Sequence, residues 1–276
     1  MKKRVMLMPL YLWTIVFVAL PMLYMLAISF VVKGETYGVT NVFTLTNYVD
    51  LVAPVNVNIF LRSMRMALET TAITLLVSYP FACAMMTCSH KQRSLLMMLI
   101  VVPFWTSALL RIYGWMIFFR SNGLLNIVLK WLGLAPVKFL YTDGATLFGM
   151  VYTFLPFMIL PIFNALERQD IALREAARDL GASPLRTFVT VVFPLTLPGV
   201  VSGITMVLVP SIGLFFISDL MGGGTQMLMG SLINHAFHAG RNWPLGAALS
   251  MVMVGMTAIT LSIYKKALGG EQMGVF

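Results

Sequence analysis

Four charged residues interrupt the long apolar stretches of this chain: Arg65, Glu69, Arg111 and Asp219. A charge in the middle of an apolar helix inside a bilayer costs roughly 2.5–3.5 kcal/mol, so such a residue tends to be paired or functional. Arg65 and Glu69 stand four residues apart, a spacing at which they can pair on one helix face. For Arg111 two alternatives are open, a pair with Glu69 or an extended side chain that reaches the membrane surface.

Asp219 and several aromatic residues have the chemistry of a site for an organic cation. A carboxylate neutralises an ammonium group, and the face of an aromatic ring attracts it. Asp219 stands close to three glycines, and Trp105, Tyr113 and Trp243 lie within or at the ends of neighbouring apolar stretches. For each aromatic residue the alternative is a place in the interfacial belt. For Asp219 the alternatives are an exposed charge and a pair with an arginine of another helix.

Residues that commonly hold metals or act as nucleophiles form no recognisable set. His235 and His238 are three residues apart with no Cys or carboxylate near them, and Cys83 and Cys88 lack further ligands. We therefore predict no metal site. The sequence also lacks H-E-x-x-H, a Ser/His/Asp set and the G-x4-G-K-[ST] loop that binds nucleotide phosphates. An enzyme, and a nucleotide site on this chain, are both disfavoured.

The segment 167–186 differs from the rest of the chain, because eight charged residues fall within it. Asp170 is a suitable N-cap, apolar residues follow at helical spacing, and Gly181 suits the left-handed position that ends a helix. Ser183 can cap a second helix whose first residue is Pro184. The pattern predicts two short helices that meet at a glycine on the membrane surface. A solvated hairpin without a partner is the open alternative.

The amino-acid composition indicates the class of the protein. Of 276 residues, 59% are hydrophobic and 11% are charged, against about 25% charged in a soluble domain. So little charge cannot cover a soluble surface, which predicts an integral membrane protein. The net charge of +9 comes from short clusters in loops, and this favours membrane anchoring over nucleic-acid binding.

Six apolar stretches are long enough to cross a bilayer as helices, which takes about 20 residues each. The first follows Lys2, Lys3 and Arg4 and is too long for the apolar core of a signal peptide. We predict an all-α membrane protein with a single domain over 1–276. The predicted spans are 9–32, 66–88, 94–119, 144–166, 198–218 and 242–264.

An even number of spans places both termini on the same side of the membrane. Eleven of the 19 basic residues fall on the side of the N-terminal cluster, so we predict that this side is cytoplasmic. The loop 168–196 is then cytoplasmic too. The uncharged stretch 220–240 is too rich in glycine and polar residues for a span. We expect a break at 222–224 and a short amphipathic or interfacial helix over about 226–238.

The charged segment resembles the EAA loop of the permease subunits of bacterial ABC importers. That loop reads E-A-A-x3-G-x9-I-x-L-P, and it is matched here at the same spacing by Glu175, Ala176, Ala177, Gly181, Val191, Phe193 and Pro194. Val191 and Phe193 are apolar replacements for the Ile and Leu of the pattern. The resemblance implies the type I importer fold, with a coupling helix between spans four and five. The residues expected to contact a separate ATPase are Glu175, Ala176, Ala177, Arg178, Asp179 and Gly181.

Further stretches are similar to the permeases of spermidine/putrescine importers, and more to their B-type than to their C-type subunit. They cover nearly the whole chain and include 47–48, 104–106, 110–114, 175–183, 218–223 and 243–248. This resemblance implies ATP-driven import of polyamines across the bacterial inner membrane by alternating access. The candidate residues of the substrate pathway are then Glu69, Trp105, Arg111, Tyr113, Asp219 and Trp243.

The same resemblance implies the partners of the chain. They are a second permease subunit that forms a heterodimer with it, two ATPase subunits that hold ATP and Mg²⁺, an extracytoplasmic binding protein, and membrane lipid. This chain itself is expected to bind no cofactor. An importer of ferric iron, thiamine or a phosphonate-like compound is an open alternative. A secondary transporter, for which an inverted repeat is expected, and a membrane enzyme are weaker ones.

Overall fold

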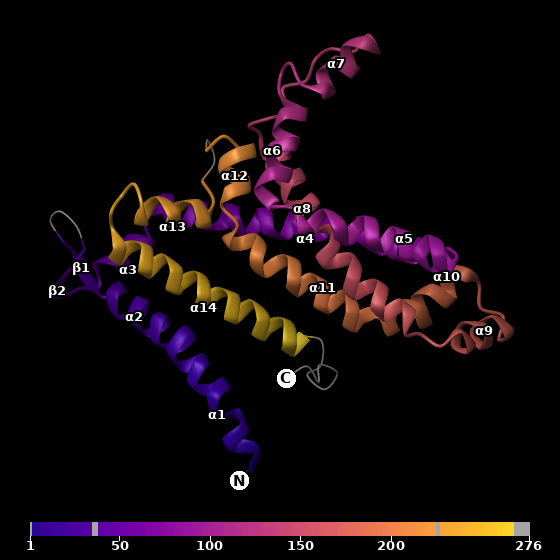
Figure 1. Ribbon diagram of the computed structural model, residues 1–276, viewed down its shortest axis with the longest axis horizontal. Coiled ribbons are helices and arrows are strands. Elements are labelled where there is room, and N and C mark those ends of the chain that lie inside the picture. The colour runs from indigo at the N-terminus through magenta and orange to yellow at the C-terminus, as the bar shows by residue number, and fades with distance from the viewer. Residues whose placement is uncertain (1, 35–37, 225–226, 268–276) are drawn as a thin grey trace. The chain divides into compact units, whose positions relative to one another are not determined.

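The computed structural model describes residues 2–34, 38–224 and 227–267, with the side chains of 8–262 inside these ranges. It is built mostly from helices, as the composition predicted (Figure 1). The chain divides into two compact units, and each is described by itself. The described residues of the first unit lie within Met1–Leu61 and Leu228–Ile263, and those of the second lie within Arg62–Met227 and Tyr264–Phe276.

The first unit contains the N-terminal and C-terminal apolar helices. Its N-terminal helix ends at Ser29, earlier than predicted, because Val31 already pairs with Phe43 in an antiparallel hairpin. A small core of Met229, Ala236 and Leu249 holds the C-terminal part together. The elements of this unit are α1 (Lys2–Thr14), a π-helix (Ile15–Ala19), α2 (Leu20–Ser29), β1 (Val31–Lys33), β2 (Val39–Phe43), α3 (Thr46–Leu51), the start of α4 (Pro54–Thr87), α13 (Met229–Phe237) and α14 (Trp243–Ala267) up to Ile263.

The helix that we expected over about 226–238 corresponds to α13. It begins at Met229, and residue 226 lies outside the described residues. The expected break at 222–224 is present: Gly223 and Gly224 have positive φ angles of 67° and 65°. A positive φ is strained for residues with a Cβ, which explains the glycines.

The second unit contains the remaining helices, and α8 and α11 form its centre. Glycine permits their close approach, because a Cβ on Gly199 would lie 2.5 Å from the carbonyl oxygen of Pro161. The hydroxyls of Tyr79 and Thr196, 2.8 Å apart, join α4 to α11. The elements are the rest of α4, α5 (His90–Val101), a 3₁₀-helix (Val102–Trp105), α6 (Ala108–Phe119), α7 (Leu124–Trp131), α8 (Asp143–Glu167), α9 (Ile171–Asp179), α10 (Pro184–Thr187), a π-helix (Phe188–Val192), α11 (Phe193–Gly213) and α12 (Phe216–Met221).

Five helical stretches among the described residues are long and apolar enough to cross a membrane. They are Met8–Ser29, Pro54–Thr87, Asp143–Glu167, Pro184–Gly213 and Trp243–Ser262. A sixth is reached only if the pair His90–Trp105 and Ala108–Trp131, bent by 98°, counts as one span. The coarse architecture of five to six apolar spans thus agrees with the prediction.

The predicted third span, 94–119, is not one straight helix. Pro103 has no backbone N–H to donate, the α-helix gives way there to a 3₁₀-helix, and the chain turns to extended backbone at Thr106. The predicted fifth span also ends early, at Gly213, so Asp219 lies on the separate short helix α12. The second span begins at Pro54, well before the predicted residue 66.

Candidate functional site

The charged segment folds as two short helices that meet at a glycine, as predicted; we call residues 170–187 the elbow. The backbone N–H of Ala172 donates to Oδ1 of Asp170 at 3.0 Å, which caps α9. Gly181 has a φ of 78°, and its N–H donates to the Arg178 carbonyl at 2.8 Å. Ser183 caps α10 by accepting a hydrogen bond from the N–H of Arg186 at 3.3 Å. The two helix N-caps and the left-handed glycine between them therefore account for the shape of the elbow.

The outer surface of the elbow combines solvent-exposed apolar side chains with charged side chains. Leu180 is 89% exposed, and Leu185 next to the second cap is 74% exposed. Glu175, Arg178 and Asp179 are exposed around them, and Ala177 is half-buried. Exposed leucines rimmed by charges are typical of a protein docking surface, since an apolar centre with a polar rim is the common anatomy of interfaces.

The elbow is tied to the helix that follows it. Gln169 donates from Nε2 to the carbonyl of Val192 at 2.9 Å, and Arg174 donates from Nη2 to Oε1 of Gln169 at 2.7 Å. These two bonds connect α9 to Val192, the last residue of the π-helix that precedes α11. Sequence reasoning missed Gln169 and Arg174, because no local pattern marks a contact across 23 residues.

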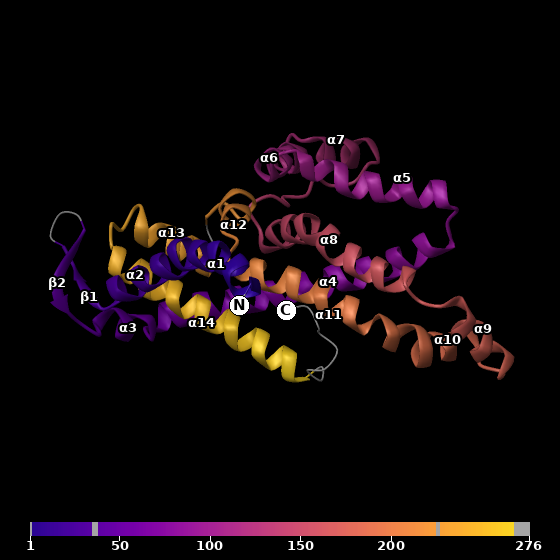
Figure 2. The ribbon, with the colours of Figure 1, turned by 60° about the horizontal axis from the view of Figure 1, so that its bottom comes forward.

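A groove of about 660 Å³ runs beside the elbow in the second unit. It lies between the C-terminal end of α8, the beginning of α9 and the first half of α11. Its lining includes the polar residues Asn164, Arg168 and Asp170. Figures 1 and 2 both show α9 and α10 together at one end of this unit, away from α6 and α12.

The predicted pair of Arg65 and Glu69 is confirmed. Nε of Arg65 lies 2.7 Å from Oε1 of Glu69, and the two side chains are 77% and 38% exposed. The charges of Arg65 and Glu69 thus neutralise each other within one helix, which lowers the free-energy cost of placing them in a membrane span.

Arg111 contacts the break between the 3₁₀-helix and α6. Its Nη1 donates to the carbonyl of Pro103 and, at 3.2 Å, to that of Thr106. The guanidinium also lies 4.3 Å from the centre of the Phe104 ring, a cation–π contact. The Pro103 carbonyl already accepts from the N–H and the hydroxyl of Thr106, so Arg111 adds a further donor there and supplies one to the carbonyl of Thr106.

The remaining pathway candidates are spread over several elements. Trp105, 82% exposed, lies on the 3₁₀-helix, and Tyr113, 48% exposed, lies on α6. Asp219 is exposed on α12, which packs on α6 and α8. Trp243 lies in the first unit, where its ring centre is 6.4 Å from that of Phe237. Within the second unit the structure thus places Arg111, Tyr113 and the neighbouring Trp105 on one bent pair.

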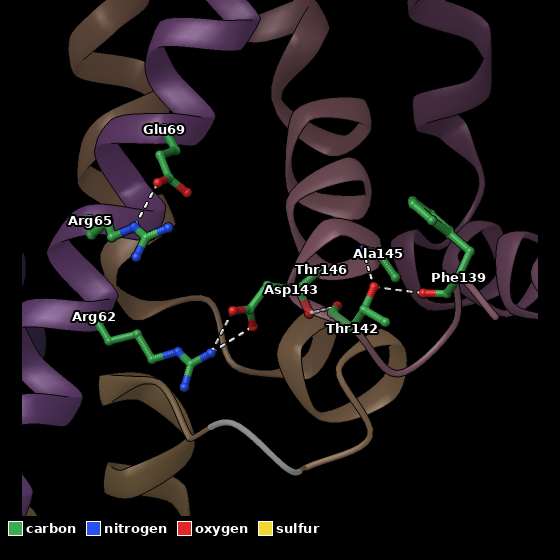
Figure 3. Close-up of polar contacts among 8 residues, drawn as sticks. All are labelled: Arg62, Arg65, Glu69, Phe139, Thr142, Asp143, Ala145 and Thr146. Atoms are coloured by element: carbon green, nitrogen blue, oxygen red, sulfur yellow. Dashed lines mark hydrogen bonds and ion pairs between the residues drawn. The ribbon is translucent and has the colours of Figure 1, made fainter. Parts of the chain in front are cut away.

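An ion pair that sequence reasoning missed joins α4 to the start of α8. Nη2 of Arg62 lies 2.6 Å from Oδ1 and 2.7 Å from Oδ2 of Asp143 (Figure 3). Asp143 stands in the first turn of α8, after Thr142, whose hydroxyl caps the helix by accepting from the N–H of Ala145. The helix dipole favours a carboxylate at this end. The signal available in the sequence was the Thr-Asp start of a helix.

Among the residues that the structure describes, no three His, Cys, Asp or Glu side chains gather as a metal site. Cys83 and Cys88 are free thiols.

Comparison with known proteins shows close relatives over most of the chain. It is 43% identical over 257 residues to the spermidine/putrescine transport system permease protein PotB of Escherichia coli, covering 92% of this chain and 94% of the relative. It is 41% identical to the Haemophilus influenzae protein of the same name, covering 92% and 90%. A search against protein-family models found no match.

Solved structures with the same fold are ABC transporters. A bacterial transporter that imports the acidic polysaccharide alginate aligns with a TM-score of 0.70 at 18% identity, over 98% of this chain and 95% of that chain. The methionine transporter MetNI aligns with a TM-score of 0.56 at 17% identity, over 75% and 91%. These likenesses concern the fold alone, because both identities are low.

Proposed function

The chain belongs to the PotB family of spermidine/putrescine transport permeases, and we propose that it carries polyamines inward as one membrane subunit of an ATP-driven importer. The observation that carries this proposal is an identity of 41–43% to two such permeases over 92% of the chain. As a multi-pass permease of the inner membrane it is a transport subunit. The six-span topology with both termini in the cytoplasm is part of the proposal, since it places the elbow where an ATPase can reach it.

The elbow is the proposed contact with the ATPase. Its exposed leucines would enter a groove of that partner, while Glu175, Arg178 and Asp179 would form polar contacts at the rim. Ala176, Ala177 and Gly181 leave room for a close approach of the two backbones. The tie from Arg174 through Gln169 to Val192 would pass the movement of the ATPase to α11. Packed helices shift as rigid units, which suits this form of transmission.

The remaining partners follow from the same family membership. We propose a heterodimer with a second permease, two ATPase subunits that hold ATP and Mg²⁺, and an extracytoplasmic protein that delivers the polyamine. Glu69, Trp105, Arg111, Tyr113, Asp219 and Trp243 stay candidates for the substrate pathway. Two of these candidates have contacts within the chain: Glu69 pairs with Arg65, and Arg111 donates to the carbonyl of Thr106 at the bend.

Uptake by the reconstituted complex tests this function. The four kinds of subunit would be placed in liposomes with ATP and Mg²⁺ on the side of the ATPase, and labelled spermidine and putrescine would be added on the other side. We expect accumulation that needs ATP and the binding protein. Accumulation of ferric iron, thiamine or a phosphonate in place of polyamine would replace the proposed substrate. Co-purification without any ATPase would overturn the importer assignment itself.

Labelling of single cysteines tests the topology, after Cys83 and Cys88 have been replaced by alanine. A membrane-impermeant thiol reagent should label Asn56→Cys in intact cells. It should label Gly181→Cys only after the membrane has been opened. Labelling of Gly181→Cys in intact cells would place the elbow outside and remove its role in coupling.

A further inference from the structure

The ion pair between Arg62 and Asp143 has an unusual geometry for an arginine. A guanidinium commonly meets a carboxylate with two nitrogens, each donating to one oxygen. Here a single nitrogen, Nη2, lies between both oxygens, at 2.6 and 2.7 Å. A primary ammonium group, which has three donors on one nitrogen, can take the same position. The carboxylate of Asp143 can thus bind an alkylammonium group as well as it binds Arg62.

The surroundings of Asp143 hold a second carboxylate with its own guanidinium. Arg65 pairs with Glu69 one helical turn along α4. Figure 3 shows Arg62, Arg65 and Glu69 along one side of α4, with Asp143 of α8 facing Arg62. The cluster formed by Arg62, Arg65, Glu69 and Asp143, which we call the α4–α8 charge cluster, has no net charge. It offers two carboxylates to a polycation that can replace the two guanidiniums.

Both carboxylates are reachable from solution. The side chain of Asp143 is 52% exposed and that of Glu69 is 38% exposed. Ion pairs with this degree of exposure contribute little to stability, because water screens them. Replacing Arg62 by another cation therefore costs little. The charge of Asp143 itself stays favourable in the first turn of α8, where the helix dipole attracts an anion.

We propose that Asp143 is a specificity-determining contact for the polyamine, whose ammonium group takes the place of Arg62 between the two carboxylate oxygens. The proposal rests on the proposed function, and on the proposed orientation it lies at the outer end of the spans. A second ammonium of the same polyamine meets Glu69 in the same way. A monoamine can replace only one guanidinium, so the cluster selects molecules with more than one amino group. While the polyamine is bound, α4 and α8 are no longer joined by Arg62.

Two substitutions separate this exchange from a purely structural tie. In the reconstituted complex, Asp143→Asn removes the contact and should raise the half-saturating spermidine concentration about three- to tenfold, less than for a buried charged contact because the side chain is half-exposed. Arg62→Gln removes the competing cation and should lower it. A tie between helices predicts the same direction for both, because both break the same bond. If Asp143→Asn fails to assemble, Arg62→Gln alone decides, since an unchanged or higher value contradicts the exchange.

The chain provides a matched control on the same helix. Glu167 ends α8, is 50% exposed and pairs with Arg93 at 3.3 Å. Glu167→Gln should leave the half-saturating concentration unchanged. If the wild-type complex takes up no polyamine, the proposed function fails. If it takes up polyamine and Asp143→Asn responds as Glu167→Gln does, only the role of Asp143 is overturned.

Discussion

Replacement of Gly181 tests the elbow through a cost that can be worked out from its backbone. Gly181 has a φ of 78°, and a Cβ built on it meets no heavy atom within 4 Å. Gly181→Ala therefore produces no clash, and its whole cost is that of left-handed backbone, about 1–2 kcal/mol for a residue with a Cβ. Asn tolerates this region better than Ala, so Gly181→Asn should cost less. Gly181→Pro should cost most, because it fixes φ near −65° and removes the bond to Arg178.

The assay is a titration of the purified permease pair with its ATPase, read as ATP hydrolysis stimulated by the loaded binding protein. If the free elbow can relax but the docked elbow must adopt the observed shape, the backbone cost of about 1–2 kcal/mol is incurred on docking. It then weakens the apparent affinity for the ATPase by about five- to thirtyfold. We expect Gly181→Ala to weaken it by about that factor, Gly181→Asn by less and Gly181→Pro by more. All variants should insert into the membrane at wild-type levels.

Gly133 provides a matched control at the end of α7. It has a φ of 72° and open space at its Cβ. The N–H groups of Gly133 and Leu134 donate to the carbonyls of Lys130 and Leu129, just as those of Gly181 and Ala182 donate to the carbonyls of Arg178 and Ala177. Gly133→Ala thus carries the same local strain outside the elbow. Its affinity for the ATPase should match the wild type. Equal effects of Gly133→Ala and Gly181→Ala, or no effect of either, would refute the reasoning.

Three further substitutions test other parts of the account. Gly149→Ala should destabilise the second unit by about 1–3 kcal/mol, because its Cβ would lie 2.6 Å from Sδ of Met221. The control Gly114→Ala has open space at its Cβ and should not lower the Tm of the purified complex. Equal Tm values for the two variants would contradict this packing. Arg111→Leu leaves the carbonyls of Pro103 and Thr106 without that donor and should cost about 1–3 kcal/mol; an unchanged Tm would show that Arg111 does not hold the bend. Asp219→Asn should raise the half-saturating polyamine concentration about tenfold, and an unchanged value would remove Asp219 from the pathway.

The sequence predicted those elements whose shape follows from local rules. The elbow is the clearest case, because Asp170, Gly181, Ser183 and Pro184 each specify one step of the backbone and all four were found in the predicted roles. The pair of Arg65 and Glu69 was likewise predictable, because side chains four residues apart on a helix lie next to each other. The apolar length of each span gave the coarse architecture.

Features that depend on contacts between distant segments were not predictable in the same way. The bend in the third apolar stretch combines Pro103 with Arg111, whose guanidinium donates to the carbonyl of Thr106 and lies against the ring of Phe104. A proline in a membrane helix is compatible with a mild kink as well as with a break, so Pro103 alone did not decide it. The pair of Arg62 with Asp143 joins residues 81 positions apart, and no pattern within one helix contains it.

ATP hydrolysis by the purified complex is the most direct test of the central claim, that this chain is the permease of an ATP-driven polyamine importer. The binding protein would be loaded in turn with spermidine, putrescine, thiamine, ferric iron and a phosphonate, and added to the complex in lipid. We predict that hydrolysis rises with spermidine or putrescine, and that Gly181→Pro abolishes the rise while the variant still inserts into the membrane. A rise with one of the other three substrates and none with polyamine would contradict the account.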